Sequence, residues 1–193
     1  MKFSLAFLLK FAGTDSNSCM ICARLSDKSV NDVLKYWDKI KEQYPEAKDI
    51  VTKKEAHCTL RYWKQDEHND FDAVSKVLGK LDYPSEIDCE ISGLDIFGDD
   101  DALVIKINSK ELNKIQSEID KEIQKLGVPP SNYDSFKGHI TLAYNIKETP
   151  KEKPNINITL NKIQFVDNKD KIFWNKQLDS TKKDVKMDKE EGT

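Results

Sequence analysis

A six-residue pattern that occurs twice constrains this chain more than any other feature of its sequence. His-x-Thr-Leu-x-Tyr spans residues 57–62 and occurs again at residues 139–144, and two of the chain's three histidines lie in it. Residues two apart on a β-strand share a face. Each copy is therefore expected to point one imidazole and one hydroxyl to the same side. Two such strands side by side predict a single site with two imidazoles and two hydroxyls.

The chemistry that needs this arrangement is proton transfer at phosphorus, by His57, Thr59, His139 and Thr141. One neutral imidazole takes a proton from the attacking oxygen, and the other, protonated, gives a proton to the leaving oxygen. The threonine hydroxyls donate hydrogen bonds to the non-bridging oxygens, where charge grows in the transition state. A duplicated structural element does not explain two histidines and two threonines on one face. We therefore predict a phosphodiester site, with the base and the acid not assigned.

No metal or other cofactor is expected at this site, because acid, base and hydroxyls cover the roles of a cation. No Asp or Glu shares the predicted histidine face on either strand. The C-x-x-C spacing of Cys19 and Cys22 lies in a predicted strand, where the two sulfurs face opposite sides. We interpret the four cysteines as small buried side chains in a reducing compartment. His68 lies in a polar loop and is expected to be solvated.

The hydrophobic periodicity indicates an α+β fold of two related lobes with mainly antiparallel sheets. Each half supplies a strand–helix unit followed by a His-x-Thr strand, and the strands are too few and too hairpin-like for a doubly wound parallel sheet. A capping-box-like start at Asn108, with Glu111 three residues on, and a stop at Gly127 bound the longest helix. The predicted strands are 18–25, 56–63, 86–97, 102–107, 138–145, 156–166 and 171–175, and the predicted helices are 30–44, 71–81 and 108–127.

The domain boundaries follow from changes in composition. Residues 18–177 are predicted to form one domain, after an N-terminal extension or strand over residues 1–17. A signal peptide is the alternative for that segment, whose apolar run is short and interrupted by Lys10. Residues 178–193 are charged with few large apolar groups, which predicts a disordered tail. No run approaches the ~20 apolar residues of a membrane span, so we expect a cytosolic protein without a membrane partner.

The net charge of the chain limits the nucleic-acid partners that it is expected to bind. The net charge is −3, which gives no general attraction for long duplex nucleic acid. A small phosphorylated ligand needs only a local site and stays possible. The oligomeric state is not predicted.

The paired motifs resemble the 2H phosphoesterase superfamily over about Ser18 to Trp174. The stretch Tyr133–Tyr144, the long helix before it and a late Trp are most similar to the phage anti-CBASS nucleases. These degrade the cyclic oligonucleotides that bacterial antiviral defence uses as alarm signals. The resemblance implies a bilobal fold with outer helices and a cleft between the lobes. It also implies the same His and Thr pairs as the catalytic set, and metal-independent cleavage of 3′–5′ linkages in cyclic di- or trinucleotides, through attack by an adjacent ribose 2′-OH, in the host cytoplasm.

Three further residues are candidates for substrate binding. The resemblance implies an acidic residue shortly before the C-terminal Trp, for which Asp167 and Asp170 are both available. Arg61 shares the predicted face of Thr59, where it would grip a second phosphate unless it is a surface charge. Trp174 is the best candidate to stack a base, an interaction that tolerates different bases.

The other aromatic side chains near the motifs are assigned mostly to the core. Trp37 lies on the apolar face of a predicted helix, and Tyr62 and Tyr144 lie on the strand face opposite the histidines. Trp63 shares the predicted face of His57 but ends its strand, so both interpretations stay open.

Two other functions also fit the sequence. An RNA 2′,3′-cyclic phosphodiesterase or RNA-end processing enzyme would use the same four residues on a short RNA-type phosphodiester. A non-catalytic sponge would bind a cyclic nucleotide without cutting it, but binding alone does not need a matched acid and base.

Overall fold

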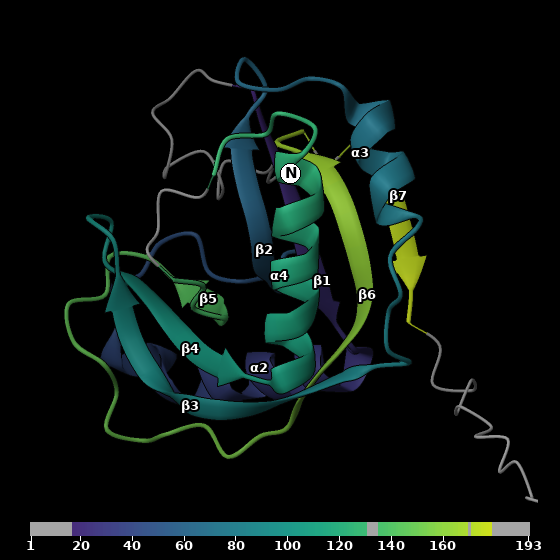
Figure 1. Ribbon diagram of the computed structural model, residues 1–193. Helices are drawn as coiled ribbons and strands as arrows, with labels where there is room; N and C mark the ends of the chain where they lie inside the picture. Colours follow the sequence, from purple (N-terminus) through teal and green to yellow (C-terminus); the bar gives the residue numbers. More distant parts are fainter. Residues whose placement is uncertain (1–16, 131–134, 170, 179–193) are drawn as a thin grey trace, which may run out of the picture.

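The computed structural model describes residues 17–130, 135–169 and 171–178, and shows an antiparallel sheet accompanied by helices (Figure 1). The expected N-terminal extension, Asp170 and almost all of the expected tail lie outside these residues. Each helix and strand that the periodicity predicts is present, with its ends shifted by a few residues. The strands are β1 (Ser18–Leu25), β2 (His57–Lys64), β3 (Ile87–Phe97), β4 (Ala102–Asn108), β5 (His139–Ala143), β6 (Ile158–Asp167) and β7 (Ile172–Gln177). The helices are α2 (Asp27–Ile40), α3 (Phe71–Leu78) and α4 (Lys110–Gln124), with a 3₁₀ turn η2 (Lys41–Gln43) after α2.

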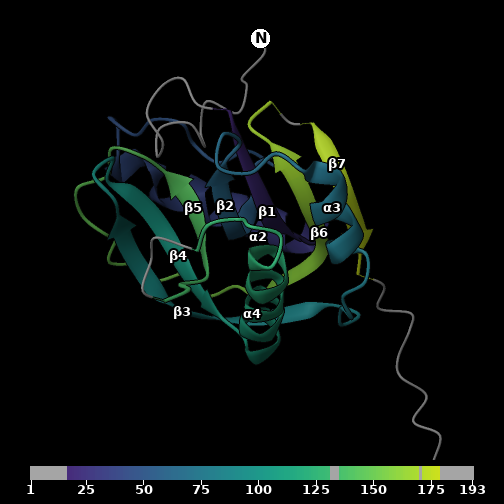
Figure 2. The same ribbon diagram turned by 45° about the horizontal axis from the view of Figure 1, so that its top comes forward.

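The strand order places the two motif strands at opposite ends of the sheet. The order is β2-β1-β6-β3-β4-β5, β7 pairs with β6, and each of these pairings is antiparallel. The sheet nevertheless curls, so that β2 and β5 approach each other (Figures 1 and 2). The curl brings two segments that are far apart in the sequence to one place.

Strand β6 joins the two halves of the sheet unequally. It pairs with β1 along nearly the whole length of that strand, from Cys19 to Leu25. Its pairing with β3 is limited to Ile87–Cys89 opposite Ile158–Leu160. The junction between the halves is therefore short, and side-chain packing must complete it.

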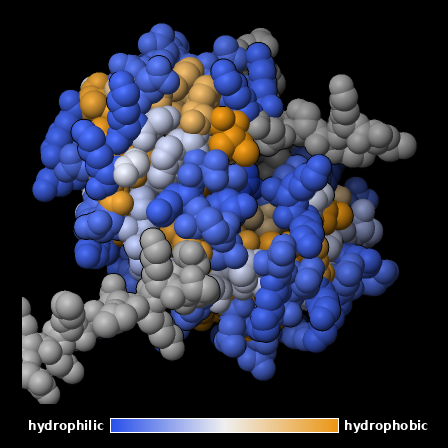
Figure 3. Space-filling view, turned by 90° about the vertical axis from the view of Figure 1, so that its right-hand side faces the viewer, coloured by the Kyte–Doolittle hydropathy of each residue, from blue (hydrophilic) through white to orange (hydrophobic). Residues whose placement is uncertain are grey.

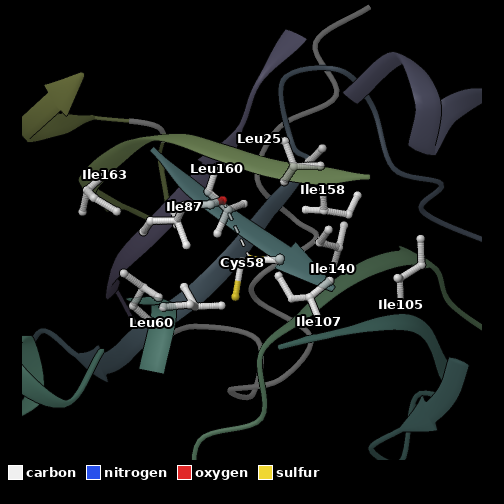
Figure 4. Close-up of a cluster of buried hydrophobic side chains, with 14 of the residues drawn as sticks. Leu25, Cys58, Leu60, Ile87, Ile105, Ile107, Ile140, Ile158, Leu160 and Ile163 are labelled. Carbon is white, nitrogen blue, oxygen red and sulfur yellow. Dashed lines mark hydrogen bonds between the residues drawn. The ribbon is translucent and has the colours of Figure 1, made fainter. Parts of the chain in front are cut away.

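One hydrophobic cluster spans both halves and supplies that packing. Figure 4 shows Cys58 and Leu60 of β2, Ile140 of β5 and Leu160 of β6 in one cluster. Helix α4 adds a fully buried stripe at the helical spacing that the sequence predicts, made by Leu112, Ile115, Ile119 and Ile123. Each such side chain contributes about 1.5–3 kcal/mol on burial, so the core fixes β2 and β5 from behind.

The helix limits follow from caps. The Ser26 and Asp70 side chains accept hydrogen bonds from the first turns of α2 and α3. Helix α4 is capped by Ser109, one residue after the expected Asn108, because the Ser109 hydroxyl accepts from Leu112 N at 3.5 Å. Gly127, with φ +89°, follows the last turn as expected.

The four cysteines are free and buried, as interpreted from the sequence. Cys19 lies in the main core, whereas Cys22 packs with Met20 and Val166 on the opposite face of the sheet. The surface that carries α3 and β7 is mainly hydrophilic, with hydrophobic side chains in small separate areas (Figure 3). None of the described helices combines the length and apolar character that crossing a membrane requires.

Candidate functional site

The two motif histidines occupy equivalent positions and are held in the same way. His57 begins β2 and His139 begins β5. The Nδ1 of each ring bonds the carbonyl oxygen two residues earlier, that of Glu55 at 2.5 Å and that of Lys137 at 2.7 Å. A carbonyl oxygen only accepts, so Nδ1 carries the hydrogen in both rings. Nε2 is therefore the nitrogen that exchanges protons in each case.

Burial favours the neutral form of both rings. Burial, together with the positive charge of Arg24, lowers the pKa of His57 to about 3. A protonated His139 lowers the pKa of His57 in the same direction, so the two rings are close enough to interact electrostatically. Burial also lowers the pKa of His139, against the bond to Lys137 O, which raises it.

Gly138 sets the start of β5. A Cβ at this position would come within 2.9 Å of Ile107 O and 3.2 Å of a Leu112 methyl group. Only glycine lets the backbone approach β4 and α4 this closely. The close approach is what aligns His139 on the strand.

The two threonines lie on the histidine faces with exchangeable partners. The Thr59 hydroxyl points to Met20 Sδ at 3.3 Å, and a thioether is a weak acceptor. The Thr141 hydroxyl bonds the phenol of Tyr144. Both threonines are partly exposed, so a phosphate oxygen can replace either partner.

The two tyrosines of the repeat lie on the histidine face, and the prediction from strict alternation is wrong. In β2, Thr59 pairs with Cys22 but Arg61 pairs with Ile21, so one residue is extra. In β5, Thr141 pairs with Val104 but Ala143 pairs with Leu103, so again one residue is extra. A β-bulge of this kind changes the phase of the strand. Tyr62 and Tyr144 thereby join the faces of Thr59 and Thr141, and Tyr144 packs on Ala102 and Val104.

The bulge in β2 also turns Arg61 away from the histidine face. Its side chain is 2% exposed, and its Nε lies 3.1 Å from Asp120 Oδ1 on α4. The expectation that Arg61 shares the face of Thr59 is wrong, and so are both roles based on it, phosphate ligand and surface charge. Arg61 ties β2 to the helix layer instead.

Both tryptophans considered for the site face the core. Trp63 stacks on Phe165 with 5.4 Å between ring centroids. Of the two interpretations left open for Trp63, the core position is the correct one. Trp174 pairs with Phe165 in the sheet and lies 5.8 Å from the ring of Tyr83, near the end of α3. This is the face opposite the histidines, so the predicted base-stacking role of Trp174 is wrong. An extra residue in β7 next to Trp174 lets Phe173 and Trp174 both pack against the core.

Asp167 has a structural role that the sequence did not reveal. Its Oδ1 accepts hydrogen bonds from Lys169 N at 2.8 Å and Lys171 N at 2.9 Å. These bonds close the turn between β6 and β7. Asp167 thus orders the end of the sheet and is not directed at the histidines, and Asp170 lies outside the described residues. Trp37 is in the core, as predicted.

Arg24 is the main site residue that sequence reasoning missed. It pairs with His57 across β1 and β2, so the two side chains share a face. Its Nε donates to Gln164 Oε1 at 2.7 Å and its Nη1 to Lys54 O at 2.8 Å. A single Arg in an apolar run has no signal of its own, and only the pairing of β1 with β2 shows its place.

The second motif has an equivalent cation, Lys106, which pairs with His139 across β4 and β5. Lys106 differs from Arg24 in being neutralised, because its Nζ lies 3.1 Å from Asp95 Oδ2 on β3. Phe97, also on β3, contacts the His139 ring edge-on at 5.0 Å. The two histidines therefore have the same tautomer but different neighbours. A cation without a counter-charge lies beside His57, and the neutral Lys106–Asp95 pair lies beside His139.

The described residues contain no group of three or more His, Cys, Asp or Glu side chains placed to hold a metal ion. The histidine faces of β1, β2 and β5 carry two imidazoles, two hydroxyls, two phenols and a guanidinium, and β2 lies in contact with β5. Together they offer proton donors, proton acceptors and positive charge, which suit a phosphodiester.

Comparison with known proteins gives a family and a fold. The family model for the anti-CBASS protein Acb1 matches residues 17–172. No curated protein matches the sequence. Among solved structures, E. coli LigT complexed with 3′-AMP has a TM-score of 0.64 at 15% identity, covering 79% of this chain and 88% of that one. The protein TT0787 of Thermus thermophilus has a TM-score of 0.63 at 16% identity, with coverages of 83% and 97%. The predicted antiparallel α+β fold of the 2H phosphoesterase type is confirmed.

Proposed function

The chain belongs to the Acb1 family of anti-CBASS proteins, and from this premise we propose that it cleaves the 3′–5′ linkages of cyclic di- and trinucleotides without a metal ion. A phosphodiesterase role follows from the family together with the 2H phosphoesterase fold. Cleavage of the signal would suppress CBASS signalling, and the proposal therefore has the protein act in the bacterial cytoplasm, where that signal acts. The observation that carries the proposal is the matched pair of histidines, each with Nδ1 held by a backbone carbonyl and with a threonine two residues on along the same strand face.

We assign His57 as the base and His139 as the acid. The unneutralised Arg24 beside His57 favours the neutral ring, which accepts a proton. The Lys106 charge beside His139 is neutralised by Asp95, so His139 holds a proton more readily than His57 does. His57 Nε2 takes the proton of the ribose 2′-OH, and that oxygen attacks phosphorus. The bond from phosphorus to the 5′ oxygen breaks, and His139 Nε2–H protonates the leaving oxygen, giving a 2′,3′-cyclic phosphate end.

The threonines support the same step. Thr59 and Thr141 donate to the non-bridging oxygens, in place of Met20 Sδ and the Tyr144 phenol. Removing one such donor costs about 100- to 1,000-fold in rate where the charge develops. Solved relatives of the same fold are complexed with 3′-AMP and ATP, which supports a nucleotide as the ligand.

The purified protein in excess EDTA is expected to degrade 3′–5′ cyclic di- or trinucleotides at an undiminished rate, because acid, base and hydroxyls are all side chains. Chromatography of the products would show a linear nucleotide with a cyclic phosphate end. Turnover of 2′,3′-cyclic phosphates or RNA ends alone would favour the RNA-processing alternative. Tight binding with recovery of intact nucleotide would favour the sponge. Loss of all activity in EDTA would contradict the metal-independent mechanism.

The pH profile of kcat/KM is expected to be a bell with its maximum on the acid side of neutrality. The acid must be protonated, and burial holds the pKa of His139 below its ordinary 6.5, so the rate falls tenfold per pH unit above that pKa. Asp95→Asn leaves Lys106 unneutralised and should move this limb to lower pH by about half to one unit. Lys106→Met leaves the carboxylate alone and should move it to higher pH. Equal profiles for both variants would refute the assignment of His139 as the acid.

A further inference from the structure

We propose that Arg24 and Lys162 form a subsite for a second phosphate of the substrate, one that is not cut while it is bound there. The inference rests on the proposed function, since it concerns a ligand with more than one phosphodiester. It replaces the role that the sequence suggested for Arg61, whose charge is already used by Asp120.

The register of the sheet places the two cations side by side next to the base. Arg24 pairs with His57 on one side and with Lys162 on the other. Directly paired residues of antiparallel strands project from the same face. Neighbouring strands lie about 4.8 Å apart, so Arg24 is one spacing and Lys162 two spacings from His57. The row therefore leads away from His57 across one continuous face, with Lys162 about 10 Å from His57.

Neither cation is neutralised among the residues that the structure describes. Arg24 donates to two uncharged oxygens, Gln164 Oε1 and Lys54 O. These bonds fix the guanidinium and leave further N–H donors of its fork to bind an anion. Lys162 forms no ion pair with a described residue, and the Arg24 and Lys162 side chains are both partly buried. By contrast, most lysines that do form ion pairs in the described chain are exposed, such as Lys28, which pairs with Asp32.

The proposed substrate supplies the matching charge. A cyclic dinucleotide carries two phosphodiesters and a cyclic trinucleotide three, and each keeps one negative charge at neutral pH. While one phosphodiester lies between His57 and His139, another must lie along the sheet or in solvent. A charge-assisted hydrogen bond is about twice as strong as a neutral one, so the row of Arg24 and Lys162 favours the first position. The subsite would thereby select substrates with more than one phosphate.

The test compares two ligands that differ in the second phosphate. One is a 3′–5′ cyclic dinucleotide, and the other is the linear dinucleoside monophosphate with the same bases and a single phosphodiester. Lys162→Met should lower kcat/KM and affinity for the cyclic ligand about tenfold. It should leave the linear ligand unchanged, since His57 and Arg24 are intact. The logarithmic dependence of cyclic-ligand affinity on salt should also become less steep.

Lys176→Met is the matched control. Lys176 lies on β7 opposite Ile163, so it projects from the other face of the same sheet while carrying the same charge. Its loss should change neither ligand. Thermal unfolding of both variants would exclude a folding defect, and Arg24→Met should weaken both ligands because Arg24 also borders His57.

Equal losses for the two ligands with Lys162→Met, or equal effects of Lys162→Met and Lys176→Met, would overturn the subsite. Calorimetric binding in EDTA separates this inference from the proposed function. If the cyclic ligand binds with the expected difference between variants but is never cut, the subsite stands and the proposed activity falls. If cleavage occurs without that difference, the activity stands and the subsite falls.

Discussion

Replacing His57 or His139 with Ala is expected to lower kcat on a cyclic dinucleotide by about 100- to 10,000-fold. Each ring supplies one proton transfer through Nε2. Among the described residues, these are the two imidazoles whose Nδ1 is held by a backbone carbonyl. The two losses should not add, because the base and the acid serve one step. The double variant should therefore be about as slow as the slower single variant.

Steady-state and single-turnover kinetics in EDTA would measure these losses. His68→Ala is the control, since His68 is the third histidine and lies after the end of β2. The expectation of a solvated His68 is wrong, because its Nε2 is buried. The variant should retain near-normal kcat. The pH profiles give a second check. His57→Ala should lose the acid limb of the bell, and His139→Ala should lose the alkaline limb. Substantial activity in both single variants would refute acid–base catalysis by this pair.

Asp120→Leu is expected to destabilise the protein by about 3 kcal/mol, the lower end for a broken buried ion pair. The change leaves the Arg61 guanidinium, 2% exposed, without the carboxylate at 3.1 Å. The Asp120 side chain is itself 25% exposed, so water moderates the loss. Arg61→Met should cost less, because it removes the buried charge and leaves Asp120 near solvent.

Urea unfolding at neutral pH would measure these differences, and the variant Arg61→Met with Asp120→Leu should recover part of the loss from Asp120→Leu. Activity separates the structural role from a role in binding. Arg61→Met should keep kcat/KM close to normal on folded protein. A large loss of affinity for a cyclic dinucleotide, without loss of stability, would return Arg61 to the substrate site.

The order of helices and strands could be predicted from the sequence because each is specified locally. Apolar residues at helical spacing gave α4, and the capping pattern at its start came within one residue of the observed cap. The approach of the motif strands also followed from the sequence, since the repeat requires two similar environments. The error of one residue at the cap of α4 arose because Asn108 and Ser109 both suit that position.

The faces of Arg61, Tyr62, Trp63, Tyr144 and Trp174 could not be predicted, and all five follow an extra residue in a strand. Alternation assumes that every residue has one partner. A bulge is defined by the partner strand, which the local sequence does not identify. Arg24 escaped notice for a related reason, because its neighbour His57 is far away in the sequence and meets it only in the sheet.

Strand β5 lies at the end of the sheet, and residues 48–51 cover part of its free edge. A free edge strand offers unpaired backbone groups to any other extended chain, which promotes aggregation. Here Lys48 exchanges backbone hydrogen bonds with Tyr144, and Val51 N donates to Leu142 O at 2.7 Å. The same short segment leads on to Glu55, whose carbonyl orients His57. The stretch of chain that shields one edge from self-association thus also steadies the base of the other half, so solubility and alignment of the site depend on the same few hydrogen bonds.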